Sequence, residues 1–207
     1  MMSQPVAIVD YGMGNLRSVQ NAVAHVGGKS IVVVEPKDLV AYDKIILPGV
    51  GAFDQAIACL RQTGLAVALN ERRQAGAHIL GICLGMQLMC TASEEDGMHE
   101  GLGWFSAKVT RFLPDTGLSV PHMGWNGVDF IREDPVLTGL ESGNDAYFVH
   151  SYHVVCDDPV DVIATSDYGL QFHCMVQRGN VRGIQFHPEK SQGLGLKIIQ
   201  NYLEMPC

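Results

Sequence analysis

The segment His78-Ile79-Leu80-Gly81-Ile82-Cys83-Leu84-Gly85 decides the fold of this 207-residue chain. Its first part is a short apolar run that predicts a buried strand over residues 78–82, and the sequence beyond it predicts a helix through Leu88 and Met89. The pattern Gly-x-Cys-x-Gly between them is typical of a tight turn that exposes a nucleophile. We therefore expect Cys83 at the carboxyl end of a strand, where open α/β sheets bind their ligands.

The sequence before this segment alternates short apolar runs with helical patterns. The apolar runs predict strands at 6–9, 31–34 and 44–47. One helical pattern ends at Gly27-Gly28, and another extends from 53 to 74 with a break near Thr63-Gly64. Such alternation predicts an open, largely parallel central sheet with helices on both faces.

The sequence after Trp104 has a different pattern, in which short strands follow one another with turn residues between them. Strands are expected at 107–112, 128–131, 146–155, 162–165, 172–176 and 181–186, and a last helix at 193–203. We expect these strands to add antiparallel or mixed pairing to the same sheet. Because no linker or internal repeat interrupts the pattern, residues 1–207 are expected to form a single domain.

Composition excludes several classes of function. The chain has 22 acidic and 14 basic residues and no basic run, which argues against a nucleic-acid partner. No window reaches the ~18 to 20 apolar residues that a membrane span needs, and the N-terminus lacks a signal-peptide pattern, so we expect a cytoplasmic protein without membrane association. The six cysteines are dispersed, which predicts neither a zinc site nor a disulfide framework, and we expect no metal.

Two further residues complete a catalytic pattern with Cys83. His187 and Glu189 lie in Gln-Phe-His-Pro-Glu, and residues two apart in an extended segment point to the same side. Glu189 can then orient the imidazole of His187, which acts as base and then as acid for a cysteine nucleophile. The alternative for Cys83 is a buried cysteine that only packs, and the flanking glycines argue against it.

Amide cleavage also needs donors for the negative charge that develops on the carbonyl oxygen. The loop Gly49-Val50-Gly51, which follows a predicted strand, is suited to present backbone N–H groups, and the N–H of Leu84 is the expected second donor. The alternative is an ordinary glycine-rich turn. A dinucleotide site at Gly12-Met13-Gly14 is ruled out because Arg17 occupies the position of the third glycine, so we expect no cofactor.

These motifs resemble a known family. Gly-Ile-Cys-Leu-Gly-Met-Gln at 81–87 with Gln-Phe-His-Pro-Glu-Lys-Ser at 185–191 is similar to the class I, triad-type glutamine amidotransferases. The segments 10–16, 48–53, 121–126 and 147–152 resemble the glutaminase subunits of imidazole glycerol phosphate synthase over essentially the whole chain. The resemblance implies a flavodoxin-like α/β fold. The departures from the family pattern are Cys90, Thr91, His173 and Cys174.

The resemblance also implies substrate, partner and site residues. Cys83 would attack the side-chain amide of L-glutamine, and the ammonia released would pass into a cyclase subunit that forms a one-to-one heterodimer with this chain. The residues that match the family's glutamine-binding positions are Gln87, Glu95, Ser151 and Tyr152, and those that match its subunit contact and ammonia passage are Asn15, Trp125 and Lys190.

Alternatives remain for some of these residues and for the function. Glu95 is alternatively a solvated acid in an acidic run, and Trp125 alternatively packs in the core. The nearest rival function is a glutaminase subunit of anthranilate or aminodeoxychorismate synthase. A second rival is a non-catalytic subunit that only docks on a cyclase, against which the intact Cys83, His187 and Glu189 argue.

Overall fold

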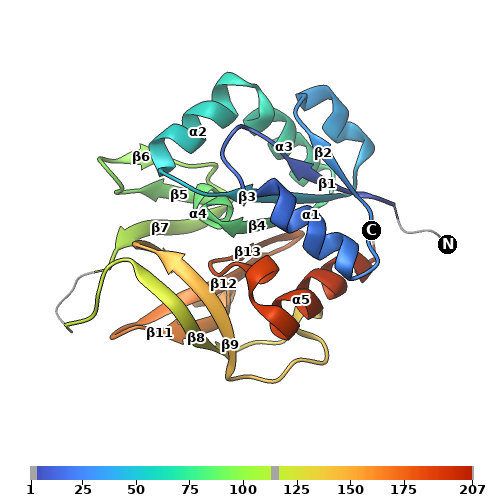
Figure 1. Ribbon diagram of the computed structural model, residues 1–207. Coiled ribbons are helices and arrows are strands. Elements are labelled where there is room, and N and C mark those ends of the chain that lie inside the picture. The colour runs from blue at the N-terminus through green and yellow to red at the C-terminus, as the bar shows by residue number, and fades with distance from the viewer. Residues whose placement is uncertain (1–3, 113–116, 207) are drawn as a thin grey trace.

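The structure is a computed structural model and describes residues 4–112 and 117–206. Its strands form one 13-stranded sheet whose centre is parallel (Figure 1). The central order is β2 (Ser30–Val33), β1 (Val6–Val9), β3 (Lys44–Gly49), β4 (His78–Cys83) and β13 (Val181–Ile184), with every neighbouring pair parallel. The strands predicted for the first half of the chain are therefore confirmed.

Antiparallel and mixed strands extend the sheet beyond β13, as the sequence predicts. The path continues through β12 (Gln171–Arg178), β10 (Tyr152–Cys156), β7 (Phe105–Arg111), β5 (Cys90–Ser93) and β6 (His99–Glu100). A branch leaves β12 through β11 (Val162–Asp167), β8 (His122–Phe130) and β9 (Asn144–His150). In Figure 1 this branch curls below the parallel part of the sheet.

Helices cover both faces of the parallel strands, which confirms the predicted fold class. On one face lie α1 (Leu16–His25) and α5 (Gln192–Glu204), and on the other lie α2 (Phe53–Gln62) and α3 (Leu65–Gln74) (Figure 1). Along β1, Val6 and Ile8 pack with the α1 and α5 side, whereas Ala7 and Val9 pack with the α2 and α3 side. This alternation follows from the two-residue period of a strand buried on both faces.

Several expected boundaries were wrong. The stretch 146–155, predicted as one strand, forms β9 and β10 with a break at Ser151, and the strand predicted at 128–131 begins earlier, at His122. The strand predicted over 181–186 ends at Ile184. The short strands β5 and β6 and the 3₁₀ turns η1 (Pro36–Ala41), η2 (Pro135–Leu137), η3 (Pro159–Asp161) and η4 (Pro188–Lys190) were not predicted.

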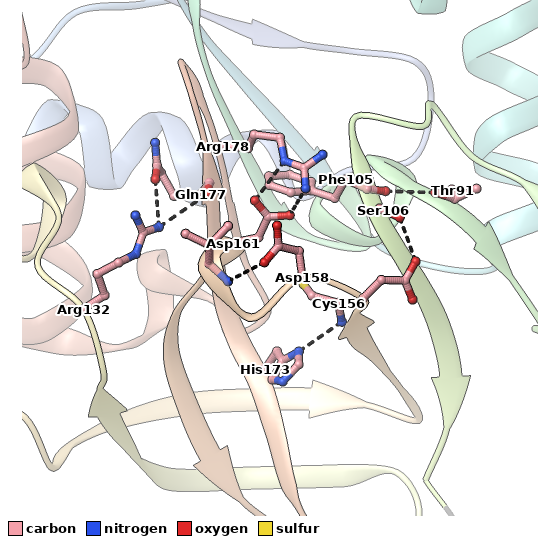
Figure 2. Close-up of polar contacts among 12 residues, drawn as sticks. Thr91, Phe105, Ser106, Arg132, Cys156, Asp158, Asp161, His173, Gln177 and Arg178 are labelled. Carbon is pink, nitrogen blue, oxygen red and sulfur yellow. Dashed lines mark hydrogen bonds and ion pairs between the residues drawn. The ribbon is translucent and has the colours of Figure 1, made fainter.

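Polar contacts tie the antiparallel strands together (Figure 2). Arg178 Nη2 and Nε bind the two carboxylate oxygens of the buried Asp161, and the hydrogen bond to Asp161 raises the pKa of Arg178. The family departures also lie here, since Thr91 Oγ1 donates to the Phe105 carbonyl and His173 Nδ1 accepts from the Cys156 N–H. Thr91 and His173 thus connect neighbouring strands, and none of the four departures lines the cavity described below.

The order of the parallel strands explains how distant segments meet. Gly49 pairs with Cys83 across β3 and β4, and Ile184 pairs with Ile82 across β13 and β4. The three strands therefore end side by side, which brings the glycine-rich loop, the cysteine turn and the His-Pro-Glu segment to one edge of the sheet. Among the residues that the structure describes, no helix is long and apolar enough to cross a membrane.

Candidate active site

The turn at Cys83 has the strained geometry that a nucleophile elbow requires. Cys83 has φ 54° and ψ −114°, in the region that residues with a side chain rarely adopt. The helix α4 (Leu84–Leu88) that follows lies so close to β3 that a Cβ built on Gly85 would come 1.9 Å from the Leu47 carbonyl oxygen. Glycine at position 85 is thus needed for the close approach that fixes the turn.

His187 and Glu189 form a buried pair at the same edge of the sheet. The His187 Nδ1–H donates to Glu189 Oε1 over 2.8 Å, and the two side chains are 2% and 1% exposed. The extended geometry predicted for this segment was wrong, because Pro188 begins the 3₁₀ turn η4 directly after His187. The turn still brings the carboxylate within hydrogen-bond distance of Nδ1, so the two residues pair as expected.

The protonation state of His187 is set by these neighbours. Burial alone would lower the pKa of His187, but interaction with Cys83 and Glu189 outweighs it and raises the pKa to about 9. At neutral pH the ring is therefore an imidazolium facing a sulfur. His187 Nε2 and Glu189 Oε2 are buried and have no hydrogen-bond partner among the described residues. Nε2 is the atom available to a substrate or leaving group.

The loop expected to form the oxyanion hole lies beside Cys83, but one of its donors points elsewhere. The Val50 N–H donates to the Met13 carbonyl oxygen over 3.3 Å, so it is directed to the loop after β1 rather than to the sulfur. Val50 and Gly51 line the cavity next to Cys83 and Leu84, and Gly51 has φ 101°, which favours glycine. The loop is therefore in place while its Val50 donor is engaged.

A cavity of about 330 Å³ opens over Cys83 and His187. Its volume is at the lower end for ligand pockets (~300 to 1,000 Å³), which suits a molecule of amino-acid size. A larger, more open hollow of about 860 Å³ lies along residues 130–140 and contains none of the predicted site residues. We assign the site to the smaller cavity because it holds both the cysteine and the histidine.

The four residues expected to bind glutamine all line this cavity. Glu95 Oε2 accepts from the Phe53 N–H at the start of α2 over 2.9 Å, and burial raises the pKa of Glu95. Gln87 Nε2 donates to the Tyr152 carbonyl at 3.0 Å, while Ser151 lies at the break between β9 and β10. Glu95 is thus bound into the cavity wall and is not a freely solvated acid.

The residues expected at the subunit contact lie outside the cavity. Trp125 on β8 is 48% exposed and packs edge-on against Tyr147, which excludes a core position. Lys190 is exposed and its Nζ lies 5.6 Å from the centre of the Tyr147 ring. Asn15 precedes α1 and makes no side-chain capping hydrogen bond. Met123, two residues before Trp125 on the same strand, is 62% exposed and was not singled out from the sequence.

Sequence reasoning also missed two polar residues close to Cys83. Gln185 is fully buried and its Nε2 lies 3.8 Å from Cys83 Sγ. His150 lines the cavity and its Nδ1 lies 2.9 Å from the Tyr152 carbonyl oxygen. For Gln185 a signal was present, because it lies two residues before His187 at the end of a strand. For His150 the sequence offered no signal beyond its place in an aromatic strand.

Comparison with known proteins shows the family of this chain. A family model described as glutamine amidotransferase class-I matches residues 7–205. The imidazole glycerol phosphate synthase subunit HisH of Sulfurimonas denitrificans is 50% identical over 202 residues, with 95% of this chain and 96% of the relative covered. The HisH subunit of Moorella thermoacetica is 48% identical over 202 residues, covering 98% of this chain and 95% of the relative.

A solved structure supports the fold. The structure titled PurLQS from Thermotoga maritima superposes with a TM-score of 0.78 at 21% identity and covers 98% of both chains. At that identity the likeness concerns the fold, and the family rests on the two sequence relatives and the family model. This chain therefore belongs to the class I glutamine amidotransferases, and within them to the HisH subunits of imidazole glycerol phosphate synthase.

Proposed function

We propose that Cys83, His187 and Glu189 hydrolyse glutamine in this chain and that the ammonia passes to a cyclase subunit of imidazole glycerol phosphate synthase. The observation that carries the proposal is the cavity in which the Cys83 turn faces His187, itself bound to Glu189 at 2.8 Å. A strained cysteine beside a buried imidazolium is the arrangement that generates a nucleophilic thiolate.

The reaction proceeds through a thioester. The Cys83 thiolate attacks the side-chain amide carbon of glutamine, and the imidazolium of His187 gives its proton to the nitrogen as the C–N bond breaks and ammonia leaves. Water then adds to the thioester while neutral His187 takes its proton, and glutamate departs as the thiolate reforms. Glu189 stabilises the charged ring in both halves of the cycle.

Glutamine is held by groups that line the same cavity. Glu95 supplies a carboxylate for the α-ammonium group, with Oε1 available because Oε2 accepts from Phe53. Gln87, Ser151 and Tyr152 complete the wall around the remaining polar groups of the substrate. A pocket with few, fixed polar groups selects one orientation of a small amino acid.

The partner contacts the face that carries Asn15, Trp125 and Lys190. Trp125 and Met123 project from β8 and are 48% and 62% exposed, and Val50 at the cavity mouth is 40% exposed. Exposed aromatic and Met side chains gathered beside a site are typical of an interface core. Docking of a cyclase here, as a one-to-one heterodimer, would cover the cavity and keep ammonia from water.

The engaged Val50 N–H supports activation by the partner. Because this N–H is bound to Met13, only part of the oxyanion hole is available in the isolated chain. One fixed donor is worth about 10²- to 10³-fold in rate. We expect glutamine turnover to rise by about 10²-fold or more when the cyclase and its ligand are added. Equal turnover with and without them would contradict the activation step.

The proposed function is tested with a coupled assay. The chain is mixed with a cyclase subunit, and formation of imidazole glycerol phosphate is followed with glutamine or with ammonium as the nitrogen source. We expect Cys83→Ala to lose synthesis from glutamine and to keep synthesis from ammonium. Synthesis from glutamine by Cys83→Ala would favour a docking role, and nitrogen transfer only to a chorismate-using partner would favour the anthranilate alternative.

A further inference from the structure

Gln185 contacts the nucleophile but has no part in the reaction described above. It directly follows β13, is 0% exposed, and its side-chain Nε2 lies 3.8 Å from Cys83 Sγ. An amide N–H directed at sulfur is a donor to a thiolate, whereas an amide oxygen in the same place would repel it. The role of Gln185 therefore depends on which end of its amide faces the sulfur.

The surrounding hydrogen bonds decide the orientation of that amide. The Tyr152 carbonyl oxygen can only accept, so the Gln87 atom that lies 3.0 Å from it is Nε2. The same Gln87 nitrogen lies 2.9 Å from the Gln185 side chain, and because it donates there too, the facing atom of Gln185 is Oε1. The other end of the Gln185 amide, its NH₂ group, then faces Cys83.

The Tyr152 carbonyl is itself held in place by a second donor. His150 Nδ1 lies 2.9 Å from it, and because a carbonyl only accepts, Nδ1 carries the proton. His150 Nε2 then accepts from His122 Nδ1 over 3.0 Å. Burial lowers the pKa of His122 to about 4 and that of His150 to about 3, so both rings stay neutral. The carbonyl that orients the two glutamine amides is thus fixed from the β8–β9 side.

We propose that Gln185 is a further catalytic residue, whose side-chain N–H donates to the Cys83 sulfur and stabilises the thiolate before attack and when the thioester is released. Gln87 is its positioning residue, since it fixes the amide through Oε1. No bond to Gln185 forms or breaks, and no proton leaves it. The inference depends on the proposed function only in taking Cys83 as the nucleophile.

The test is alkylation of Cys83 in the full chain without a partner or substrate. Gln185→Met keeps the length of the side chain and removes the donor. We expect iodoacetamide to modify Cys83 about fivefold more slowly at neutral pH, the effect of about one lost hydrogen bond, as measured by mass spectrometry of the Cys83 peptide. Cys59, which is partly exposed on α2, reports the intrinsic reactivity of the reagent in the same sample.

A control variant and a second test variant distinguish loss of the Gln185 donor from a general effect of the substitution. Gln74→Met, on the exposed end of α3, should alkylate at the wild-type rate. Gln87→Met leaves Gln185 in place but frees its amide to turn, so we expect an intermediate slowing of Cys83 alkylation. Thermal unfolding of each variant establishes that it is folded. If Gln185→Met fails to fold, the rate of Cys83 alkylation in Gln87→Met alone decides whether the Gln185 amide stabilises the thiolate.

A kinetic readout separates Gln185 from a structural role. With the cyclase present, Gln185→Met should lower kcat for glutamine by about fivefold with little change in KM, and synthesis from ammonium should be unaffected. An unchanged alkylation rate in folded Gln185→Met would overturn the proposal. Because alkylation needs neither glutamine nor a cyclase, slowed alkylation would support the role of Gln185 even if the proposed synthase function failed.

Discussion

Replacing Glu189 by Gln removes one of the two interactions that keep His187 charged. The change preserves the shape of the side chain and its hydrogen bond to Nδ1 but removes the negative charge 2.8 Å from the ring. Burial, which lowers the pKa of His187, is then opposed by Cys83 and by an uncharged hydrogen-bond acceptor. The pKa therefore falls from about 9.

The size of the expected effect on activity follows from the raised pKa of His187. Moving the pKa of His187 from its ordinary 6.5 to about 9 corresponds to about 3 kcal/mol of preference for the charged ring. Each unit lost in the variant reduces the ratio of charged to neutral His187 by about tenfold. We expect the alkaline limb of kcat/KM for glutamine, near pH 9 in the wild type, to move down by at least about one unit, and kcat to fall by about 10²-fold or more.

The same pair contributes to stability in a defined pH window. Because the pKa of His187 is raised in the folded state, its contribution is fully present below about pH 6.5 and is lost as the pH rises through about 9. In thermal unfolding, the Tm of Glu189→Gln should therefore fall less than that of the wild type as the pH rises through this window. The assay is glutamine turnover with the cyclase between about pH 6 and 10, with Glu71→Gln, at an exposed position of α3, as the control. An alkaline limb at the same pH in Glu189→Gln would show that the Glu189 charge does not hold His187 in its charged form.

Three further outcomes are expected. Arg182→Met leaves buried Asp134 without its bidentate partner, whose nitrogens lie at 2.8 and 2.9 Å. We expect the free energy of unfolding to fall by about 3 to 5 kcal/mol and Tm to fall by about 10 °C; an unchanged Tm in thermal unfolding would contradict this. Trp125→Ala should weaken cyclase binding by about 2 kcal/mol, or about 30-fold in Kd by titration, without lowering Tm, because the ring is half exposed; unaltered affinity would argue against this face. Gly85→Ala should lose both glutaminase activity and stability, measured by turnover and Tm, since its methyl would lie 1.9 Å from the Leu47 carbonyl oxygen; a stable, active variant would show that the turn tolerates a side chain.

Much of the parallel half of the fold could be predicted because each element there carries its own pattern. Strands β1, β3 and β4 are continuous apolar runs buried on both faces, and the glycines before α3 and after α1 mark where helices end. These signals are local, so a single sequence contains them.

The antiparallel half was less predictable because its pairing is set by distant partners. Gly124 and Gly127 interrupt the strand pattern of β8, so the first part of that strand was not predicted. No glycine or proline marks the break at Ser151. The strands β5 and β6 are only four and two residues long and are too short to show a period. Their existence follows from the pairing of β5 with β7 and of β6 with β5, which the sequence does not display.

In the site, too, features marked by local sequence could be predicted and contacts between distant residues could not. The proximity of Cys83, His187 and Glu189 could be predicted because turn glycines and a proline surround them, although the 3₁₀ turn at Pro188 could not. The contact between Gln185 and Cys83 joins residues 102 apart in sequence and depends on the pairing of β13 with β4. The engaged Val50 N–H likewise depends on how the loop after β1 packs against the loop after β3.

If Cys83 is the nucleophile of the glutaminase half-reaction, an acyl intermediate forms on its sulfur during turnover. The chain is mixed with its cyclase and glutamine, quenched in acid during turnover, and digested for mass spectrometry. We expect the Cys83 peptide to gain the mass of glutamine less ammonia, and Cys83→Ala neither to form an adduct nor to release glutamate. Glutamate release by Cys83→Ala, or an adduct on another residue, would show that Cys83 is not the nucleophile.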